Sequence, residues 1–64
     1  MSDQPYDEEP LLIDIHRLSR LLSLSRRTIE RMLSKAGIPP PIRIAGKRLW
    51  RVEDIQNWID EQRA

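Results

Sequence analysis

The residues from Leu18 to Leu33 set the strongest limit on the architecture of this chain. The segment reads LSRLLSLSRRTIERML, and its apolar residues recur at helical spacing on both sides of Ser23 and Leu24. This pattern predicts two short amphipathic helices joined by a tight turn. Ser25 is the expected N-cap of the second helix, because its hydroxyl can accept a hydrogen bond from a free backbone N–H of the first turn.

The second of these helices begins with positive charge. Arg26 and Arg27 follow the Ser25 cap directly. Cationic side chains are unfavourable beside the positive end of a helix macrodipole, by about 0.3–1 kcal/mol per exposed charge. A polyanionic partner would offset that cost. Two short helices with a tight turn and a basic second N-terminus are the parts of a helix-turn-helix DNA reader, so the pattern indicates duplex DNA as a partner.

Composition argues against several other classes of protein. The chain has 64 residues and no cysteine, which fits one small domain without disulfides or a zinc site. Its single histidine, His16, is expected to be exposed, and no metal cluster, cofactor motif, carboxylate pair or phosphate loop is recognisable, so no enzyme is expected. No apolar run approaches the roughly 18 residues of a membrane span, and no signal-peptide pattern opens the chain, so the cytoplasm is the expected compartment.

Charge is distributed unevenly, although the net charge is only +1. Residues 1–10 carry four acids and no base, residues 17–51 carry ten bases and one acid, and residues 52–64 carry four acids and one base. A local basic patch attracts phosphates even where the total charge is small. The alternative interpretation is that these arginines only form a solvated face.

The first ten residues are acidic and contain Pro5 and Pro10, so a disordered tail is expected over residues 1–10, ahead of a folded domain over residues 11–64. The tail is either a solvated leader or a segment that lies transiently over the basic patch. The apolar run at residues 11–13 either adds an edge strand or packs against the core.

Helical periodicity predicts the core. A first helix is expected over residues 15–22 with Asp14 as its N-cap. A second is expected over residues 26–36, with Gly37 as the left-handed residue that ends it. The residues expected to face inward are Ile15, Leu18, Leu21 and Leu22 on the first helix and Ile29, Met32, Leu33 and Ala36 on the second.

The second half of the chain predicts a hairpin and a third helix. Three prolines at residues 39–41 form a stiff extended segment, which is either a spacer for the next strand or a polyproline II ligand. Residues 42–44 and 48–51 are expected to pair through a turn at residues 45–47, in which Gly46 supplies a positive φ. The side chains expected to point from this hairpin into the core are those of Ile42, Ile44 and Trp50.

A third helix is expected over residues 52–62, and its acidic first turn at Glu53 and Asp54 suits the helix dipole. Its apolar face contains Val52, Ile55, Trp58 and Ile59. Trp50 and Trp58 are either the largest core side chains or exposed stacking platforms. The expected fold class is therefore α+β, with three helices and a two-stranded antiparallel hairpin.

These motifs together resemble the AlpA/excisionase-like family of small winged helix-turn-helix DNA-binding proteins, relatives of the DNA-binding head of MerR regulators. The resemblance runs from Leu12 to Ile59 and rests on LLSLSRRTIERML, IPPPIRI, a glycine turn before a basic strand, and WRVEDIQNWI, in that order. The sequence departs from the family at Ser23, where glycine is usual, so strain is expected in that turn. The acidic residues 1–10 lie outside the resemblance.

The resemblance implies that the second helix enters the major groove. The corresponding residues at its start and on its exposed side are Ser25, Arg26, Arg27, Thr28, Glu30 and Arg31. Arginine can contact guanine O6 and N7 with two hydrogen bonds, and Thr28 can meet a phosphate or a thymine methyl. Glu30 either accepts from a cytosine amine or orients one of the arginines of its own helix.

The resemblance also implies a wing on the adjacent DNA backbone or minor groove, formed by Gly46, Lys47 and Arg48 with Arg43 beside them. Arg17 and Arg20 on the first helix would contact phosphates, which position a protein without reading sequence.

Members of this family are excisionases, which bend attachment-site DNA for an integrase, or transcription regulators of mobile elements. The expected function is sequence-specific binding of double-stranded DNA by such a phage or mobile-element accessory protein in a bacterial host. The expected partners are duplex DNA, an integrase or recombinase, and further copies of the chain on DNA, without a membrane or a small-molecule effector. The alternative is a protein-interaction module that binds an integrase or regulator without reading DNA.

Overall fold

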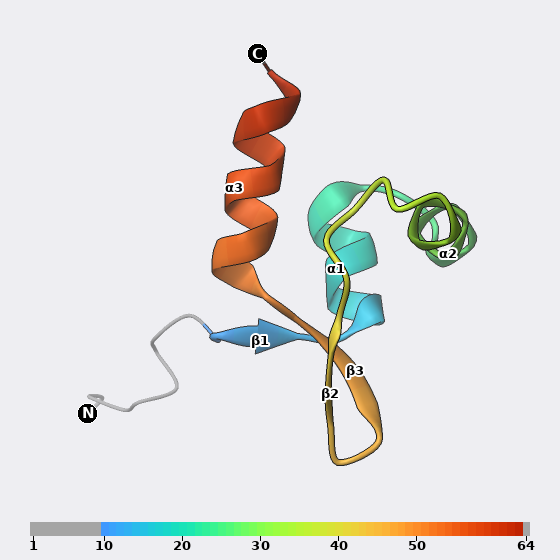
Figure 1. The fold of residues 1–64 in the computed structure, drawn as a ribbon, viewed down its shortest axis with the longest axis vertical. Helices are drawn as coiled ribbons and strands as arrows, with labels where there is room; N and C mark the ends of the chain where they lie inside the picture. Colours follow the sequence, from blue (N-terminus) through green and yellow to red (C-terminus); the bar gives the residue numbers. More distant parts are fainter. Residues whose placement is uncertain (1–9, 64) are drawn as a thin grey trace.

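The computed structural model describes residues 10–63, so the predicted acidic tail, apart from Pro10, lies outside the described residues. The elements are β1 (Leu12–Ile13), α1 (Ile15–Leu22), α2 (Arg26–Ser34), β2 (Ile42–Ile44), β3 (Lys47–Arg51) and α3 (Val52–Gln62). Helices α1 and α2 form a pair, the β2–β3 hairpin extends away from the helices, and α3 stands apart from α2 (Figure 1). No helix within residues 10–63 is both long and apolar enough to cross a membrane.

The helices begin where their sequences predict. The carboxylate of Asp14 accepts a hydrogen bond from the backbone N–H of Arg17 at 2.9 Å and caps α1. This hydrogen bond is also the main reason why the pKa of Asp14 lies below its usual range. The Ser25 hydroxyl caps α2 by accepting from the N–H of Thr28 at 3.1 Å. Helix α3 follows β3 directly and has no side-chain cap.

The end of α2 differs from the prediction. The helix ends at Ser34 rather than Ala36, and the left-handed residue that follows is Ala36, with φ 56°, rather than Gly37. The N–H of Ala36 donates to Leu33 O at 3.1 Å, and the N–H of Gly37 donates to Met32 O at 2.8 Å. These are the two hydrogen bonds of a Schellman motif, so the motif is present one residue earlier than the glycine indicated.

The sheet has three antiparallel strands in the order β1-β3-β2, one more than predicted. The run at residues 11–13 supplies the edge strand, and Ile13 pairs with Trp50. The hairpin turn contains two residues, not three: Ala45 and Gly46 have φ values of 53° and 79°. Two consecutive positive φ values are the mark of a type I′ turn, and Lys47 therefore belongs to β3.

The shorter turn changes the register, and with it the faces of the hairpin. Ile42 pairs with Leu49 and Ile44 pairs with Lys47. A shift of one residue moves side chains to the other face of a sheet, so both isoleucines lie on the face opposite Trp50. Trp50 is 1% exposed, whereas Ile42 and Ile44 are 39% and 46% exposed, so the prediction that they point into the core is wrong.

The core lies between the sheet and the helices. Its buried side chains are Ile13, Ile15, Leu18, Ile29, Ile38, Trp50 and Ile55. The indole N–H of Trp50 donates to the carbonyl of Pro39 at 2.8 Å, which satisfies a buried donor and ties the proline segment to β3. This contact agrees with the interpretation of residues 39–41 as a spacer.

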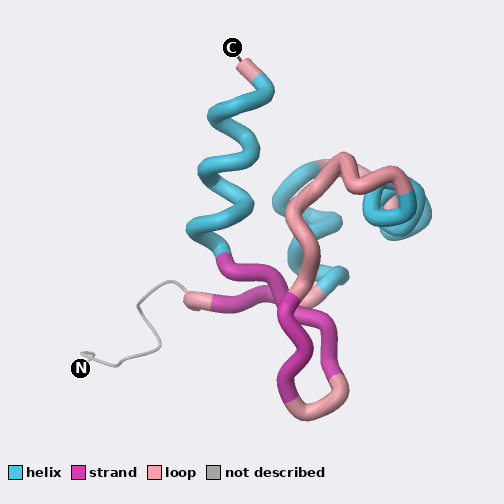
Figure 2. The backbone as a smooth tube through the Cα atoms, viewed as in Figure 1, coloured by secondary structure: helices cyan, strands magenta, loops and turns pink. Residues whose placement is uncertain are grey.

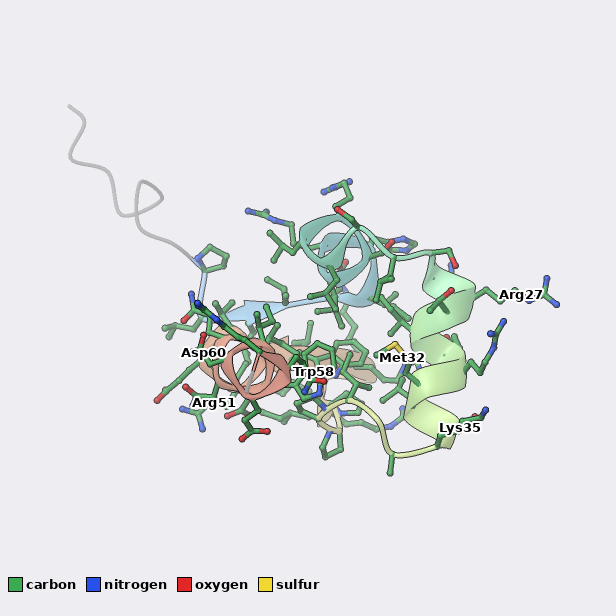
Figure 3. The ribbon with its side chains drawn as sticks, turned by 90° about the horizontal axis from the view of Figure 1, so that it is seen from above. Arg27, Met32, Lys35, Arg51, Trp58 and Asp60 are labelled. Carbon is green, nitrogen blue, oxygen red and sulfur yellow. The ribbon has the colours of Figure 1, made fainter. Side chains whose placement is uncertain are left out.

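Three further residues predicted to face inward are exposed: Leu21, Ala36 and Ile59. Leu21 lies at the margin of the α1 stripe, and Ala36 follows the end of α2. Ile59 lies on α3, which continues beyond the strands (Figure 2), and its side chain is 41% exposed. Trp58 is partly buried, packs against the core and faces Met32 of α2 (Figure 3).

Candidate nucleic-acid interface

The turn between α1 and α2 is held by local hydrogen bonds. Ser23 has φ 57° and ψ 37°, the left-handed conformation that glycine adopts without steric cost. Its N–H donates to Arg20 O at 3.3 Å, and the N–H of Leu24 donates to Ser19 O at 3.1 Å. The Ser19 hydroxyl donates to Leu24 O at 2.6 Å, and the Leu24 side chain packs against the core. The turn therefore fixes the direction in which α2 leaves α1.

Helix α2 has a buried side and a cationic side. Ile29 is completely buried, and this anchors the helix. Arg26, Arg27 and Arg31 are exposed, and Arg27 points away from the body of the molecule (Figure 3). Within residues 10–63, the ion pairs involve other arginines, namely Arg48 and Arg51. The three guanidinium groups of α2 are therefore accessible to an external anion.

Two predicted major-groove residues form the start of α2. The hydroxyls of Ser25 and Thr28 lie 2.9 Å apart, in addition to the backbone cap between these residues. Thr28 is partly buried. The structure therefore gives both side chains a role in shaping the helix terminus that presents Arg26 and Arg27.

Glu30 has a partner that sequence reasoning did not identify. Arg48 of β3 donates to both of its carboxylate oxygens, at 3.1 Å to Oε1 and 2.7 Å to Oε2. Sequence reasoning named a cytosine amine or an arginine of the same helix as the partner of Glu30, whereas its side-chain hydrogen bonds within residues 10–63 come from Arg48, which is directed toward α2. Hydrogen bonding to Arg48 holds the pKa of Glu30 below its usual range, and the carboxylate raises the pKa of Arg48. One signal pointed to such a pair: Glu30 is the only acid among residues 17–51.

The other predicted contact residues lie on the surface. Arg17 and Arg20 are exposed on α1, and Arg43, Gly46 and Lys47 are exposed on the hairpin. The structure adds a further exposed cation that sequence reasoning did not assign to the site, Lys35 at the C-cap of α2. Its position after the last turn, where a cation suits the helix dipole, could have indicated it.

Charge is separated across the molecule. Most exposed arginines of residues 10–63 belong to α1, α2 and the hairpin, whereas α3 carries the acids Glu53, Asp54, Asp60 and Glu61. Arg27 and Lys35 lie on the opposite side of the molecule from Asp60 (Figure 3). This arrangement gives the α2 side a positive field, which attracts phosphates. Residues 10–63 contain no group of acidic or histidine side chains that could hold a metal ion.

A capped basic helix set by a tight turn, with a hairpin beside it, defines the winged helix-turn-helix class. The model of the helix-turn-helix domain family matches residues 14–63. The chain therefore belongs to this family, which is the AlpA/excisionase-like family that its motifs resemble. This membership supports DNA binding in general. Comparisons with curated proteins and with solved structures give no significant match.

Proposed function

We propose that this protein binds double-stranded DNA sequence-specifically, with α2 in the major groove. The observation that carries the proposal is the accessible cationic side of α2, formed by Arg26, Arg27 and Arg31 opposite the buried Ile29. The major groove admits an α-helix, and a guanidinium group can donate two hydrogen bonds to guanine O6 and N7. Arg27 is the leading candidate for this contact, because it points directly away from the core (Figure 3).

The exposed cations of α1 and the hairpin would contact the DNA backbone. Arg17 and Arg20 lie on α1, which crosses next to α2, and Arg43 and Lys47 lie on the hairpin. Contacts to phosphates fix register and orientation and add affinity that is independent of sequence. The interface would thus combine base reading by α2 with positioning by α1 and the hairpin.

The biological role that fits this interface is that of a phage or mobile-element accessory protein in a bacterial host, either an excisionase or an AlpA-type transcription regulator. Both roles need a DNA-binding surface and no bond chemistry. The proposed further partners are an integrase or recombinase and additional copies of the chain on neighbouring sites. Selection from a random duplex pool, followed by footprinting and a bending assay on the selected site, separates a bent, repeated site from a single operator.

The direct test of DNA binding is a titration of labelled duplex by fluorescence anisotropy over a range of salt concentrations. With about five to seven phosphate contacts, log K should fall with log salt with a slope of roughly −5. An affinity that does not change between low and moderate salt contradicts the proposal. Binding of a protein partner in the absence of DNA, without any duplex affinity, would favour the interaction-module alternative.

Two substitutions distinguish contacts that read bases from contacts that position the protein on the DNA backbone. Arg27→Ala should change the preferred bases in the selection, whereas Lys47→Ala should weaken all sequences alike and lower the salt slope by about one. Arg63→Ala is the matched control, because it removes one positive charge from the end of α3, away from the site. Equal, sequence-independent losses for Arg27→Ala and Lys47→Ala would remove the assignment of α2 to the groove.

A further inference from the structure

Helix α2 and the hairpin are joined by a single bidentate ion pair. Within residues 10–63, the side-chain hydrogen bonds between these two elements are those from Arg48 to Glu30, at 3.1 and 2.7 Å. The two residues are 18 positions apart, and their side chains are 31% and 42% exposed. A guanidinium–carboxylate pair with two parallel hydrogen bonds fixes orientation as well as distance. The pair is therefore suited to set the angle between α2 and the hairpin.

The hairpin is held by the rest of the domain through β3, which contacts β1, α1 and α3, whereas its turn lies at the end of the sheet. It extends away from the helices (Figure 1), and Ile42 and Ile44 on its outer face are exposed. Arg43 is the cross-strand partner of Arg48, and like charges directly opposite each other destabilise a strand pair. The carboxylate of Glu30 compensates the charge of Arg48 at this position. Without it, the hairpin would lose both a tether and a compensating charge.

Building on the proposed function, we propose that Glu30 and Arg48 are positioning residues that hold the hairpin tip in a fixed relation to α2. Helix and wing then meet the DNA as one preformed surface, and less conformational freedom is lost on binding. The role of both side chains in this arrangement is to hold each other, because the two hydrogen bonds direct the Arg48 guanidinium and the Glu30 carboxylate toward one another. The DNA contacts of the wing come from its exposed cations, Arg43 and Lys47.

The test is a double-mutant cycle with Glu30→Gln, Arg48→Gln and the double variant, measured as affinity for the selected duplex at fixed salt. Each single change should weaken binding by about fivefold, the upper range for exposed ion pairs, and the double variant should be no weaker than either. Glu30→Gln should weaken binding even though it removes a negative charge and so raises the net charge by one. Glu53→Gln is the matched control: it removes the carboxylate of the exposed Arg51–Glu53 pair, whose atoms lie 3.0 Å apart, with the same change in charge. It should not weaken binding.

Two other patterns would overturn the proposal. If charge alone matters, Glu30→Gln tightens binding, Arg48→Gln weakens it, and the double variant returns to the wild-type affinity. If both side chains contact DNA independently, the fold losses of affinity of the two single variants multiply in the double variant. In that case the single variant Glu30→Gln also alters the base preference at one base pair.

A measurement without DNA keeps this proposal separate from the proposed function. Backbone ¹⁵N relaxation of Ala45, Gly46 and Lys47 should show greater mobility in either single variant. The exchanged pair, Glu30→Arg with Arg48→Glu, should restore the wild-type mobility, and circular dichroism melting confirms that each variant is folded. Unchanged mobility in the single variants overturns the positioning role. If the wild-type protein binds no duplex, the proposed function is refuted. The relaxation measurement still tests the positioning role, because it is made without DNA.

Discussion

The left-handed turn between α1 and α2 gives a quantitative test of the helix-turn-helix geometry. Ser23 has φ 57°, and a residue with a Cβ atom pays about 1–2 kcal/mol for this conformation. Glycine avoids that cost but is more flexible in the unfolded chain, which removes about 0.4–1 kcal/mol of stability. The difference predicts that Ser23→Gly stabilises the domain by about 0.5–1 kcal/mol.

The side chain of Ser23 should not offset this gain. It is exposed, and its hydroxyl makes no hydrogen bond to the rest of residues 10–63. In a domain of this size, about 1 kcal/mol raises Tm by roughly 4–8 °C, so Ser23→Gly should raise Tm by about 2–8 °C. Thermal melting followed by circular dichroism, with urea unfolding as a second measure, detects such a shift.

Ser23→Ala is the control, because it removes the hydroxyl and keeps the Cβ atom. It should leave Tm close to the wild-type value, and both variants should keep the wild-type affinity for duplex DNA. A lower or unchanged Tm for Ser23→Gly would show that this residue is not held in the left-handed region, and the turn geometry described above would be wrong.

Burial and charge give further predictions. Trp50→Ala should cost about 3–5 kcal/mol, because the side chain is 1% exposed, and this loss should abolish cooperative melting of so small a domain. Trp58 is only partly buried, so Trp58→Ala should cost less and should leave a cooperative transition at lower Tm. The pKa of Glu30 is lowered in the folded state, so its contribution to stability is complete above the usual glutamate pKa and disappears as the pH falls through the lowered pKa. The free energy of unfolding should therefore fall less steeply in Glu30→Gln than in the wild-type protein as the pH is lowered through this range.

The parts of the fold that could be predicted from sequence are those set by local interactions. The caps at Asp14 and Ser25 depend on hydrogen bonds to a backbone N–H three residues away, and both are confirmed. The bounds of α1 and α3 agree with the prediction, since helical periodicity and acidic or capping residues mark them. The accessible arginines of α2 follow from the same periodicity once Ile29 is placed in the core.

The hairpin register could not be predicted in the same way. Ala45 gives no sign of a positive φ, so its neighbour Gly46 alone suggested the turn and left its length open. A difference of one residue in the turn was enough to move Ile42 and Ile44 from the expected inner face to the outer face. Residue type also gave a wrong prediction at the end of α2. Glycine was expected to adopt the left-handed conformation there, but Ala36 rather than Gly37 has the positive φ.

The pairing of Glu30 with Arg48 could not be predicted from the sequence for a different reason. Helical spacing suggests partners within one or two turns, whereas these residues meet only in the folded domain, where α1 packs against both α2 and β3. A lone acid in a basic segment indicates that it has a partner but does not say which one. The relation between the recognition helix and the wing is therefore a property of the tertiary structure.

The central claim is that the guanidinium groups at the start of α2 read guanines in the major groove. Its most direct test is to replace single guanines of the selected duplex with 7-deazaguanine, which lacks the N7 acceptor but still pairs with cytosine. At one or more positions the wild-type protein should lose about 1–3 kcal/mol of binding free energy, and Arg27→Ala should lose no more on the same duplex than on the unmodified one. Equal affinity of the wild-type protein for modified and unmodified duplexes at every guanine would contradict the claim.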